Sequence, residues 1–227
     1  MRAPQRLGRL RGSYLDASSR FRGALSPFRY GAPRGTRSLE GFLYPATYEL
    51  RAGAPANDLV SKQLTAFAEN VERVDLRRAR RKNLTAYDVL IIASMVEREA
   101  QLAAERPKIA AVIYNRLKDA TPIGIDATIR YATDNWTRPL RQSELQIESP
   151  YNTRKRQGLP PTPIGNPGLA SIRAAARPAN VDYRYYVVQP GTCGKHAFSS
   201  SFAQFAADSR RYEAARAAAG GKSPTTC

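Results

Sequence analysis

The middle of the chain is a long stretch without a regular hydrophobic period. Residues 120–168 contain seven prolines and show neither the spacing of an amphipathic helix nor the alternation of a strand. A stretch of this kind inside a compact domain is usually either functional or disordered. Aromatic and aliphatic residues interleaved along it argue against disorder: Tyr131, Trp136, Tyr151 and Leu159. We therefore expect an ordered, loop-rich surface, where binding residues tend to lie.

Regular structure is predicted on both sides of this stretch. Apolar residues at helical spacing predict three helices before it, at 59–70, 86–100 and 107–117, with Asn57 capping the first and a Thr85–Asp88 capping box the second. After it, the sequence predicts a short Ala-rich helix at 167–177, strands at 182–188 and 195–198, and a last helix after Ser201. Residues 39–50 look extended. We therefore expect an α+β fold, with helices around a small antiparallel sheet and a long ordered loop region.

The charge of the chain is strongly positive and uneven. The 227 residues carry 36 Lys and Arg against 19 Asp and Glu, a formal net charge of +17. Residues 1–38 hold nine Arg and one acid with little periodic apolar content, so we expect a basic, poorly ordered N-terminal segment. The sequence therefore predicts three parts: this N-terminal segment, a catalytic domain at 39–217 and a flexible tail at 218–227. The charge also supports a second hypothesis, a non-catalytic binding protein for an anionic polymer, either a cell-wall polymer or nucleic acid.

Several classes of site do not fit the sequence. No run of 18 apolar residues is present, so we expect no transmembrane helix, and no export signal is visible. One histidine, His196, and two cysteines without CxxC spacing make a zinc site improbable. Phosphate-cradling glycine loops and a GxSxG elbow are also missing. We therefore expect neither a metal nor a cofactor. Cys193 and Cys227 could pair in an oxidising compartment or remain thiols.

Two glutamates near the end of the apolar 86–100 helix are the candidate acids. Glu97 and Glu99 point about 200° apart on a helix, so they cannot share one site. Glu97 falls beside the apolar stripe, and Glu99 lies further round, toward Met95 and Ile92. A carboxyl at the edge of an apolar face tends toward the raised pKa that a general acid needs. This reasoning favours Glu97; the alternative is that both are solvated helix glutamates.

Four groups of residues resemble, in order, the YceG-like endolytic murein transglycosylases. They are E-G-F-L-Y-P-A-T-Y at 40–48, A-S-M-V-E-R-E at 93–99, V-I-Y-N-R-L at 112–117, and S-P-Y-N-T at 149–153 together with the Gly- and Pro-rich segment 158–171. The resemblance runs from about residue 39 to 215. One departure is at 124–128, where the family usually has Q-x-D-P-T and this chain has Gly-Ile-Asp-Ala-Thr.

The resemblance implies an enzyme. Its activity would be cleavage of the β-1,4 bond between N-acetylmuramic acid and N-acetylglucosamine in peptidoglycan, which leaves 1,6-anhydro ends and terminates or trims nascent strands. The first Glu of V-E-x-E, Glu97, would be the catalytic acid. A single carboxyl suffices: it protonates the leaving oxygen and then deprotonates the sugar's own C6 hydroxyl, which attacks C1. Ordinary glycosidases need two carboxylates instead.

The resemblance also implies substrate contacts, partners and a location. The implied substrate-binding residues, each of which could instead be a satisfied loop or core residue, are Glu40, Tyr44, Asn115, Asp126, Thr128, Tyr151, Asn152 and Thr153. The partners would be peptidoglycan glycan strands and peptidoglycan synthases, with no nucleic acid. The enzyme would act at the extracytoplasmic face of the bacterial membrane. Since the family's cytoplasmic tail, membrane helix and LysM-like domain are not in this chain, we expect membrane contact only through an anchor that it lacks.

Overall fold

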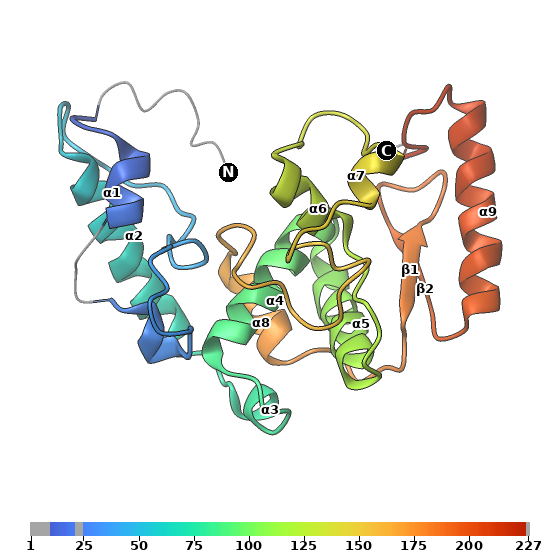
Figure 1. Ribbon diagram of the computed structural model, residues 1–227, viewed down its shortest axis with the longest axis horizontal. Helices are drawn as coiled ribbons and strands as arrows, with labels where there is room; N and C mark the ends of the chain where they lie inside the picture. The colour runs from blue at the N-terminus through green and yellow to red at the C-terminus, as the bar shows by residue number, and fades with distance from the viewer. Residues whose placement is uncertain (1–9, 21–24, 226–227) are drawn as a thin grey trace.

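A computed structural model describes residues 10–20 and 25–225 of the protein (Figure 1). The elements before the proline-rich stretch are α1 (Tyr14–Arg20), η2 (Pro27–Tyr30), α2 (Ala56–Val71), α3 (Arg77–Arg80), α4 (Ala86–Glu99), η3 (Ala103–Glu105) and α5 (Arg106–Lys118). The remaining elements are α6 (Asp126–Thr133), α7 (Gln142–Leu145), α8 (Leu169–Ala176), β1 (Tyr185–Val188), β2 (His196–Ser199) and α9 (Phe202–Ala218). The α+β prediction is confirmed.

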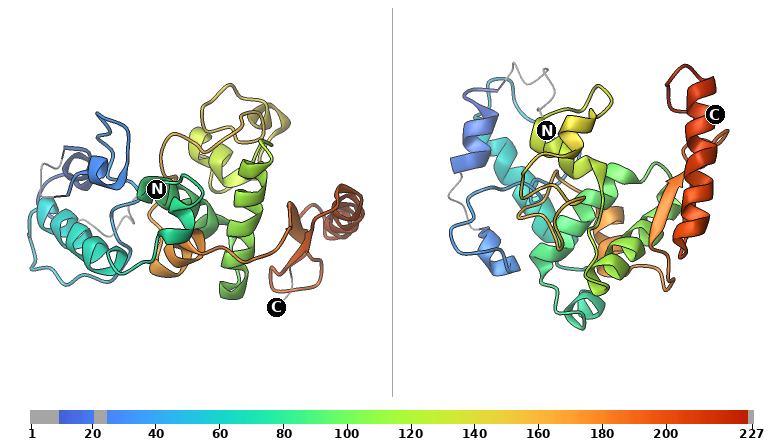
Figure 2. Two further views of the ribbon diagram at one scale, coloured as in Figure 1. Left: turned by 90° about the horizontal axis from the view of Figure 1, so that it is seen from below. Right: turned by 45° about the vertical axis from the view of Figure 1, so that its right-hand side comes forward.

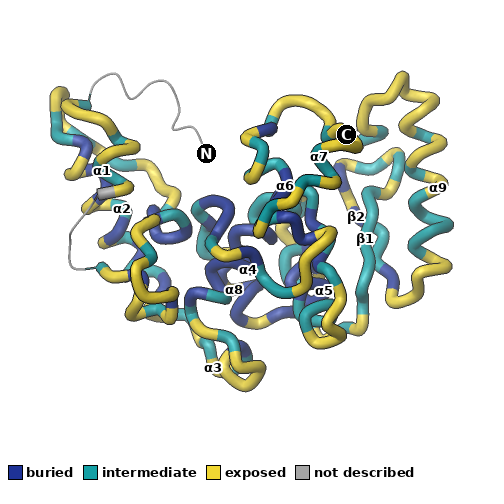
Figure 3. The backbone as a smooth tube through the Cα atoms, viewed as in Figure 1, coloured by how far each residue is buried: buried dark blue, intermediate teal, exposed yellow. Residues whose placement is uncertain are grey.

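Helix α4 is the centre of the helical body. Its residues from Val89 to Val96 are all buried, and α8 and α5 pack against it (Figure 3). The predicted capping box is present, because the Asp88 backbone N–H donates to Thr85 Oγ1 at 3.1 Å and the Thr85 N–H donates to Asp88 Oδ2 at 2.8 Å. Since other elements surround α4 along most of its length, the side chains at its C-terminal end contact those elements.

The two strands form an antiparallel hairpin between the helical body and α9 (Figures 1 and 2). Tyr185 pairs with Ser199 and Val188 with His196. Because successive strand residues face opposite sides, Tyr185 and Tyr186 serve different surfaces. Tyr185 stacks on Phe205 of α9, with ring centroids 5.1 Å apart, so Tyr186 is directed toward the body.

The N-terminal segment differs from the expectation of poor order. Helix α1 packs on α2, and the Tyr14 hydroxyl donates to Gln63 at 2.7 Å. Arg11 exchanges two backbone hydrogen bonds with the residues flanking Pro55, and Ala32 is buried in the core. Several apolar residues of the segment thus pack in or against the core, whereas Leu15 and Phe28 are exposed; the packed ones are Tyr14, Ala17, Leu25, Tyr30 and Ala32. Residues 1–9 and 21–24 lie outside the described part.

Two loop regions also differ from their predictions. Residues 39–50 form turns rather than a strand, because the Asn166 side chain takes the place of a strand partner: its Oδ1 accepts from Gly41 N at 2.8 Å and Leu43 N at 3.2 Å. The proline-rich stretch is ordered but contains α6 and α7, two short helices that hydrophobic periodicity missed. Helix α2 begins at Ala56 with Pro55 at its N-cap, so Asn57 is inside it.

The C-terminal region folds back on the hairpin turn. After α9 the chain forms turns, and the Gly191 N–H donates to the Pro224 carbonyl at 3.0 Å. Cys193 is disulfide-bonded, and Cys227 lies outside the described residues. None of the helices within 10–20 and 25–225 is long and apolar enough to cross a membrane.

Candidate active site

Three consecutive side chains at the end of α4, those of Glu97, Arg98 and Glu99, contact three different parts of the fold. Glu97 reaches the start of α8. Arg98 lies against Trp136, with its guanidinium carbon 4.3 Å from the ring centroid, and against Gly165, where an added Cβ would come within 3.3 Å of Arg98 Nε. Glu99 reaches β1 and the start of α6. The two glutamates therefore belong to separate environments, as their helical angle predicts.

Glu97 is bound to the N-terminal end of α8. Its Oε2 accepts hydrogen bonds from Ser171 Oγ at 2.5 Å and from the backbone N–H of Gly168, the N-cap residue, at 3.3 Å. Arg106 Nη2 lies 4.0 Å from Glu97 Oε1, and Arg106 Nε donates to Ser171 Oγ at 3.0 Å. A carboxylate at a helix N-terminus satisfies free backbone donors and complements the helix dipole. Glu97 thus fastens α8 and the loop before it to α4, and its side chain is 36% exposed.

Glu99 is half-buried between the hairpin and the start of α6. The Tyr186 hydroxyl donates to Glu99 Oε2 at 3.0 Å. Burial raises the pKa of Glu99, and the Asp126 carboxylate raises it further; the hydrogen bonds from Tyr186 and from the Ala127 backbone N–H, together with His196, act in the opposite direction. Burial also raises the pKa of Tyr186, so this hydroxyl stays a donor at neutral pH. The direction of the Glu99 pKa shift is the one that a general acid needs.

Asp126 and the residues around it form the α6 side of the site. Asp126 Oδ1 accepts from Arg154 Nε at 2.7 Å, and both side chains remain partly exposed. Thr128 and Thr153 are buried behind them, with their hydroxyl oxygens 2.9 Å apart, and Thr153 Oγ1 accepts from the Ile125 N–H at 3.0 Å. These threonines therefore fix the start of α6, while Asp126 is available to solvent.

Glu40 and Tyr151 meet through a residue that sequence reasoning did not select. The Tyr131 hydroxyl donates to Glu40 Oε2 at 2.6 Å, and the Tyr131 and Tyr151 rings lie 4.9 Å apart. The Tyr151 hydroxyl is 2.7 Å from Thr162 Oγ1. Burial, followed by the hydrogen bond to Glu40, raises the pKa of Tyr131. This chain of contacts joins the 40–48 motif to the proline-rich stretch.

The other predicted contact residues have structural partners. The Asn115 amide donates to the carbonyls of Val181 and Tyr183, at 3.0 and 2.8 Å, and holds the segment before β1 against α5. Asn152 is fully buried and donates to two loop carbonyls. The Tyr44 carbonyl accepts from the Tyr48 hydroxyl at 2.7 Å. The side-chain amides of Asn115 and Asn152 thus have protein partners, as does the backbone of Tyr44, and the substrate role of these three residues stays a prediction.

His196 has a buried structural partner. Its Nδ1 lies 2.7 Å from Glu105 Oε2, and its backbone N–H donates to Glu105 Oε1 at 2.9 Å. Both residues are buried, at 7% and 5% exposure. The pair ties β2 to the start of α5. Within the described part of the chain, no group of three or more His, Cys, Asp or Glu residues could hold a metal ion.

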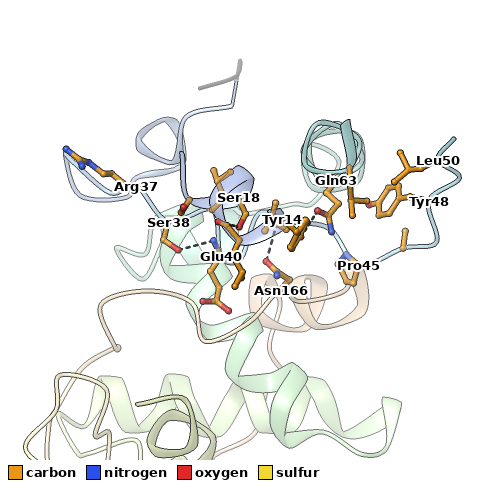
Figure 4. A pocket seen from close by; sticks show the side chains of 16 residues that line it. Tyr14, Ser18, Arg37, Ser38, Glu40, Pro45, Tyr48, Leu50, Gln63 and Asn166 are labelled. Atoms are coloured by element: carbon orange, nitrogen blue, oxygen red, sulfur yellow. Dashed lines mark hydrogen bonds between the residues drawn. The ribbon is translucent and has the colours of Figure 1, made fainter. Parts of the chain in front are cut away.

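A large cavity lies beside the 40–48 motif (Figure 4). It has a volume of about 790 Å³ between α1, α2 and the 37–50 segment, and Glu40 and Asn166 are on its wall. Tyr14 and Tyr48 supply aromatic surface. Neither Glu97 nor Glu99 lines this cavity, so it is separate from the end of α4.

Comparison with known proteins is decisive for the family. The profile of the YceG-like family matches residues 9–211. The chain belongs to the YceG-like family. This match begins well before residue 39, in agreement with the packing of α1 and η2.

Curated relatives and a solved structure give the same result. An endolytic murein transglycosylase of Bacillus subtilis is 36% identical over 155 residues, which are 66% of this chain and 42% of the relative. One from Streptococcus pneumoniae R6 is 34% identical over 154 residues, 66% of this chain and 28% of the relative. The crystal structure of a YceG-like protein from Listeria monocytogenes matches with a TM-score of 0.72 and 29% identity, covering 84% of this chain and 65% of that one. The chain thus spans less than half the length of these curated relatives.

Sequence reasoning missed several residues of this YceG-like site. Tyr186, Arg154 and Tyr131 contact Glu99, Asp126 and Glu40 respectively. A signal existed for Tyr186, because alternation along the predicted strand separates it from Tyr185. The other two lie in the stretch without periodicity, and nothing local indicates their partners.

Proposed function

We propose that this chain is the catalytic part of a lytic transglycosylase. Its substrate is the peptidoglycan glycan strand, in which it cleaves the β-1,4 bond between N-acetylmuramic acid and N-acetylglucosamine. The names of the curated relatives support this substrate. The single observation that carries the chemistry is Glu99, a carboxyl whose pKa is raised by burial.

We assign the proton donor to Glu99 rather than to Glu97, the residue favoured by the sequence. A general acid has to be protonated near neutral pH, and burial supports this state for Glu99. Glu97 is held by the α8 N-terminus and Arg106, so its carboxyl oxygens already have protein partners. Glu97 then has a positioning role, because it fixes the 165–171 loop beside the site. The experiment below tests both residues.

The reaction needs one carboxyl. Glu99 donates its proton to the glycosidic oxygen as the C1–O bond breaks, and the N-acetylglucosamine end leaves with a new hydroxyl. The carboxylate of Glu99 then removes the proton of the C6 hydroxyl, whose oxygen bonds to C1. The ring itself holds this hydroxyl close, so it has a large effective concentration compared with water. The product is a 1,6-anhydro end, and Glu99 is protonated again.

Asp126 is the carboxylate that would serve the competing reaction, hydrolysis by water. Hydrolysis requires a second carboxylate as nucleophile or as a base for water. Asp126 is within electrostatic reach of Glu99 and partly exposed, although Arg154 occupies one of its oxygens. If hydrolysis is the main reaction, Asp126→Asn abolishes it; in the proposed reaction this change only weakens substrate contacts.

The location and partners follow from the substrate. Peptidoglycan strands lie outside the cytoplasmic membrane, so the enzyme acts at the extracytoplasmic face, where it terminates or trims nascent strands. Peptidoglycan synthases that make these strands are the protein partners we propose. The proposed substrate contacts that are partly accessible are Glu40, Tyr44, Asn115, Asp126 and Tyr151.

The test compares Glu99→Gln with Glu97→Gln on uncrosslinked glycan strands. We expect Glu99→Gln to lose nearly all cleavage, on the order of 10²-fold or more, since an acid contributes about 10²–10⁴-fold. Its melting temperature should not fall, because Gln removes an ionisable group from a buried position. Glu97→Gln should lose less activity. Full cleavage by Glu99→Gln, together with loss in a folded Glu97→Gln, would return the role to Glu97.

The product is read by mass spectrometry with and without borohydride. We expect ends that are lighter than hydrolysis products by one water and that borohydride does not reduce. A reducible muramic end as the main product contradicts the transglycosylase assignment.

A further inference from the structure

A second large cavity lies at the opposite end of α4 from Glu99. It has a volume of about 750 Å³ and is lined by α3, the start of α4, the end of α5 and residues 178–181. Asp88 is on its wall, eleven residues before Glu99, which corresponds to roughly 16 Å along a helix axis. We call this cavity the α3 groove; α3 is at the bottom of Figure 1.

The α3 groove has an excess of unpaired positive charge. Four of its lining residues are cations that make no ion pair or side-chain hydrogen bond with any described residue: Arg78, Arg81, Lys82 and Lys118. The only acid of the lining, Asp88, accepts from the Thr85 backbone and hydroxyl at 2.8 and 2.7 Å and is occupied by this cap. The neighbouring Arg77 is paired with Asp75 at 2.8 Å, on the outside of the groove.

The inner wall of the groove is fixed independently of these cations. The Tyr114 hydroxyl donates to the Ala175 carbonyl at 2.8 Å, and the Asn115 amide donates to Val181 and Tyr183. These bonds join α5 to α8 and to the segment that follows it. The cations therefore surround a preformed hollow, and like charges are kept near one another although no protein anion neutralises them. Such an arrangement costs stability unless an anion enters.

We propose that the α3 groove binds a linear chain of phosphate groups. Three of the four cations, Arg78, Arg81 and Lys82, come from α3 and the residues directly after it, and Lys118 comes from the end of α5, so the lining can neutralise more than one phosphate group. Phosphate oxygens accept charge-assisted hydrogen bonds from Arg and Lys at the same time. The large exposed hydrophobic residues of the described chain, Leu15, Phe28 and Phe202, are all outside the groove, so the lining offers nothing for insertion into a lipid surface.

The experiment measures binding of linear polyphosphate to the whole chain as a function of salt. The groove variant replaces its four cations with Gln. The control variant changes net charge equally by replacing exposed, unpaired cations elsewhere: Arg51, Lys62, Arg210 and Lys222. We expect the groove variant to bind at least tenfold more weakly than the control. The slope of log affinity against log salt should fall by about 3, because each neutralised phosphate contributes about 0.7.

Equal losses in the two variants overturn the proposal, since net charge alone would then explain binding. Lys82→Glu, a single exposed change, is the second variant; it should weaken binding more than Lys62→Glu even if the fourfold variant fails to fold. Polyglutamate of equal charge tests the chemistry, and equally tight groove-dependent binding of it overturns the phosphate assignment. Single-stranded DNA of equal charge distinguishes the phosphate source: tighter groove-dependent binding than polyphosphate supports the proposal with nucleic acid as that source.

This site is independent of the proposed function. Glu99→Gln should bind polyphosphate as the unmodified chain does, and the groove variant should still cleave glycan strands. Loss of polyphosphate binding and loss of glycan cleavage are therefore separate results, and each tests only one of the two proposals.

Discussion

The hydrogen bond from Tyr186 to Glu99 makes a sharp prediction for the pH dependence of cleavage. A hydroxyl that donates to a carboxylate stabilises the ionised form, so Tyr186 lowers the pKa of Glu99 against the effect of burial. Tyr186→Phe removes this donor. The pKa of Glu99 then rises further. Since the protonated acid is the active form, activity should persist to higher pH before it is lost.

The magnitude follows from the 3.0 Å contact with a group that becomes charged. Net hydrogen bonds to charged groups are worth about 1.5–3 kcal/mol, and about 1.4 kcal/mol corresponds to a tenfold change in acid dissociation. The alkaline limb of the kcat profile should move up by about one pH unit or more. The plateau should fall by less than tenfold, because a weaker acid also transfers its proton less readily. The assay is initial-rate cleavage of uncrosslinked strands from acidic to alkaline pH.

The matched control is Tyr185→Phe, the same chemical change one residue earlier. Tyr185 faces Phe205 and the Arg116 guanidinium, 5.0 Å from its ring, and contributes nothing to Glu99. Phe at 186 can keep the ring contacts with His196 and Phe198, at 5.2 and 5.8 Å, so a general loss of packing is not expected. A Tyr186→Phe profile that coincides with that of the control, or moves to lower pH, refutes the reasoning.

Two further predictions concern stability, measured by denaturant unfolding. Gly41→Ala should lower the free energy of unfolding by about 2–4 kcal/mol, because its φ of 92° disfavours a side chain and the new Cβ would lie 2.6 Å from Pro163 Cγ. The control Gly53→Ala, at φ 73° with open space around it, should lower it by about 1 kcal/mol. Equal losses in the two variants would contradict the clash. Glu105→Ala should cost about 3 kcal/mol, because His196 loses acceptors for two buried donors at about 1–3 kcal/mol each; a loss below about 1 kcal/mol would contradict this role.

Elements with strong local signals were predicted well. The Thr85–Asp88 box and the apolar run after it gave α4, and Pro107 within the first turn gave α5. The two strands were also found, each slightly shifted. Such signals depend on residues three or four apart, or alternating, and these are present in the sequence itself.

The proline-rich stretch shows where local signals end. Helices α6 and α7 are short; Tyr131 of α6 is held by Glu40, far along the chain, whereas Glu144 of α7 is held by the nearby Arg138. The 39–50 segment depends on Asn166 in the same way. A period cannot report the partners Glu40 and Asn166, because each contact joins residues about 90 or more positions apart.

The choice between the two glutamates also depends on burial, which only the fold supplies. The sequence argument treated α4 as a helix with one apolar face, and Glu97 bordered that face. In the fold, Ile92 and Met95 are as fully buried as Val96, so the side toward Glu99 is covered too. The angle between the glutamates agrees with the fold, in which the two contact different elements, and which of them is the acid stays a prediction that the two Gln variants test.

The fold also explains why one short segment can organise a site from distant parts of the chain. Glu97, Arg98 and Glu99 leave the end of α4 in different directions and contact, respectively, the start of α8, Trp136 with Gly165, and Tyr186. In the proposed reaction, the carboxyl that fastens α8 and the proton donor are different residues, and one residue type can serve both roles because the two environments differ. Two residues of separation on a helix provide that difference, because they place one glutamate at a helix N-terminus and the other beneath the hairpin. In the proposed reaction, the contact of Glu99 with the hairpin is therefore what separates the proton donor from the carboxyl that fastens α8.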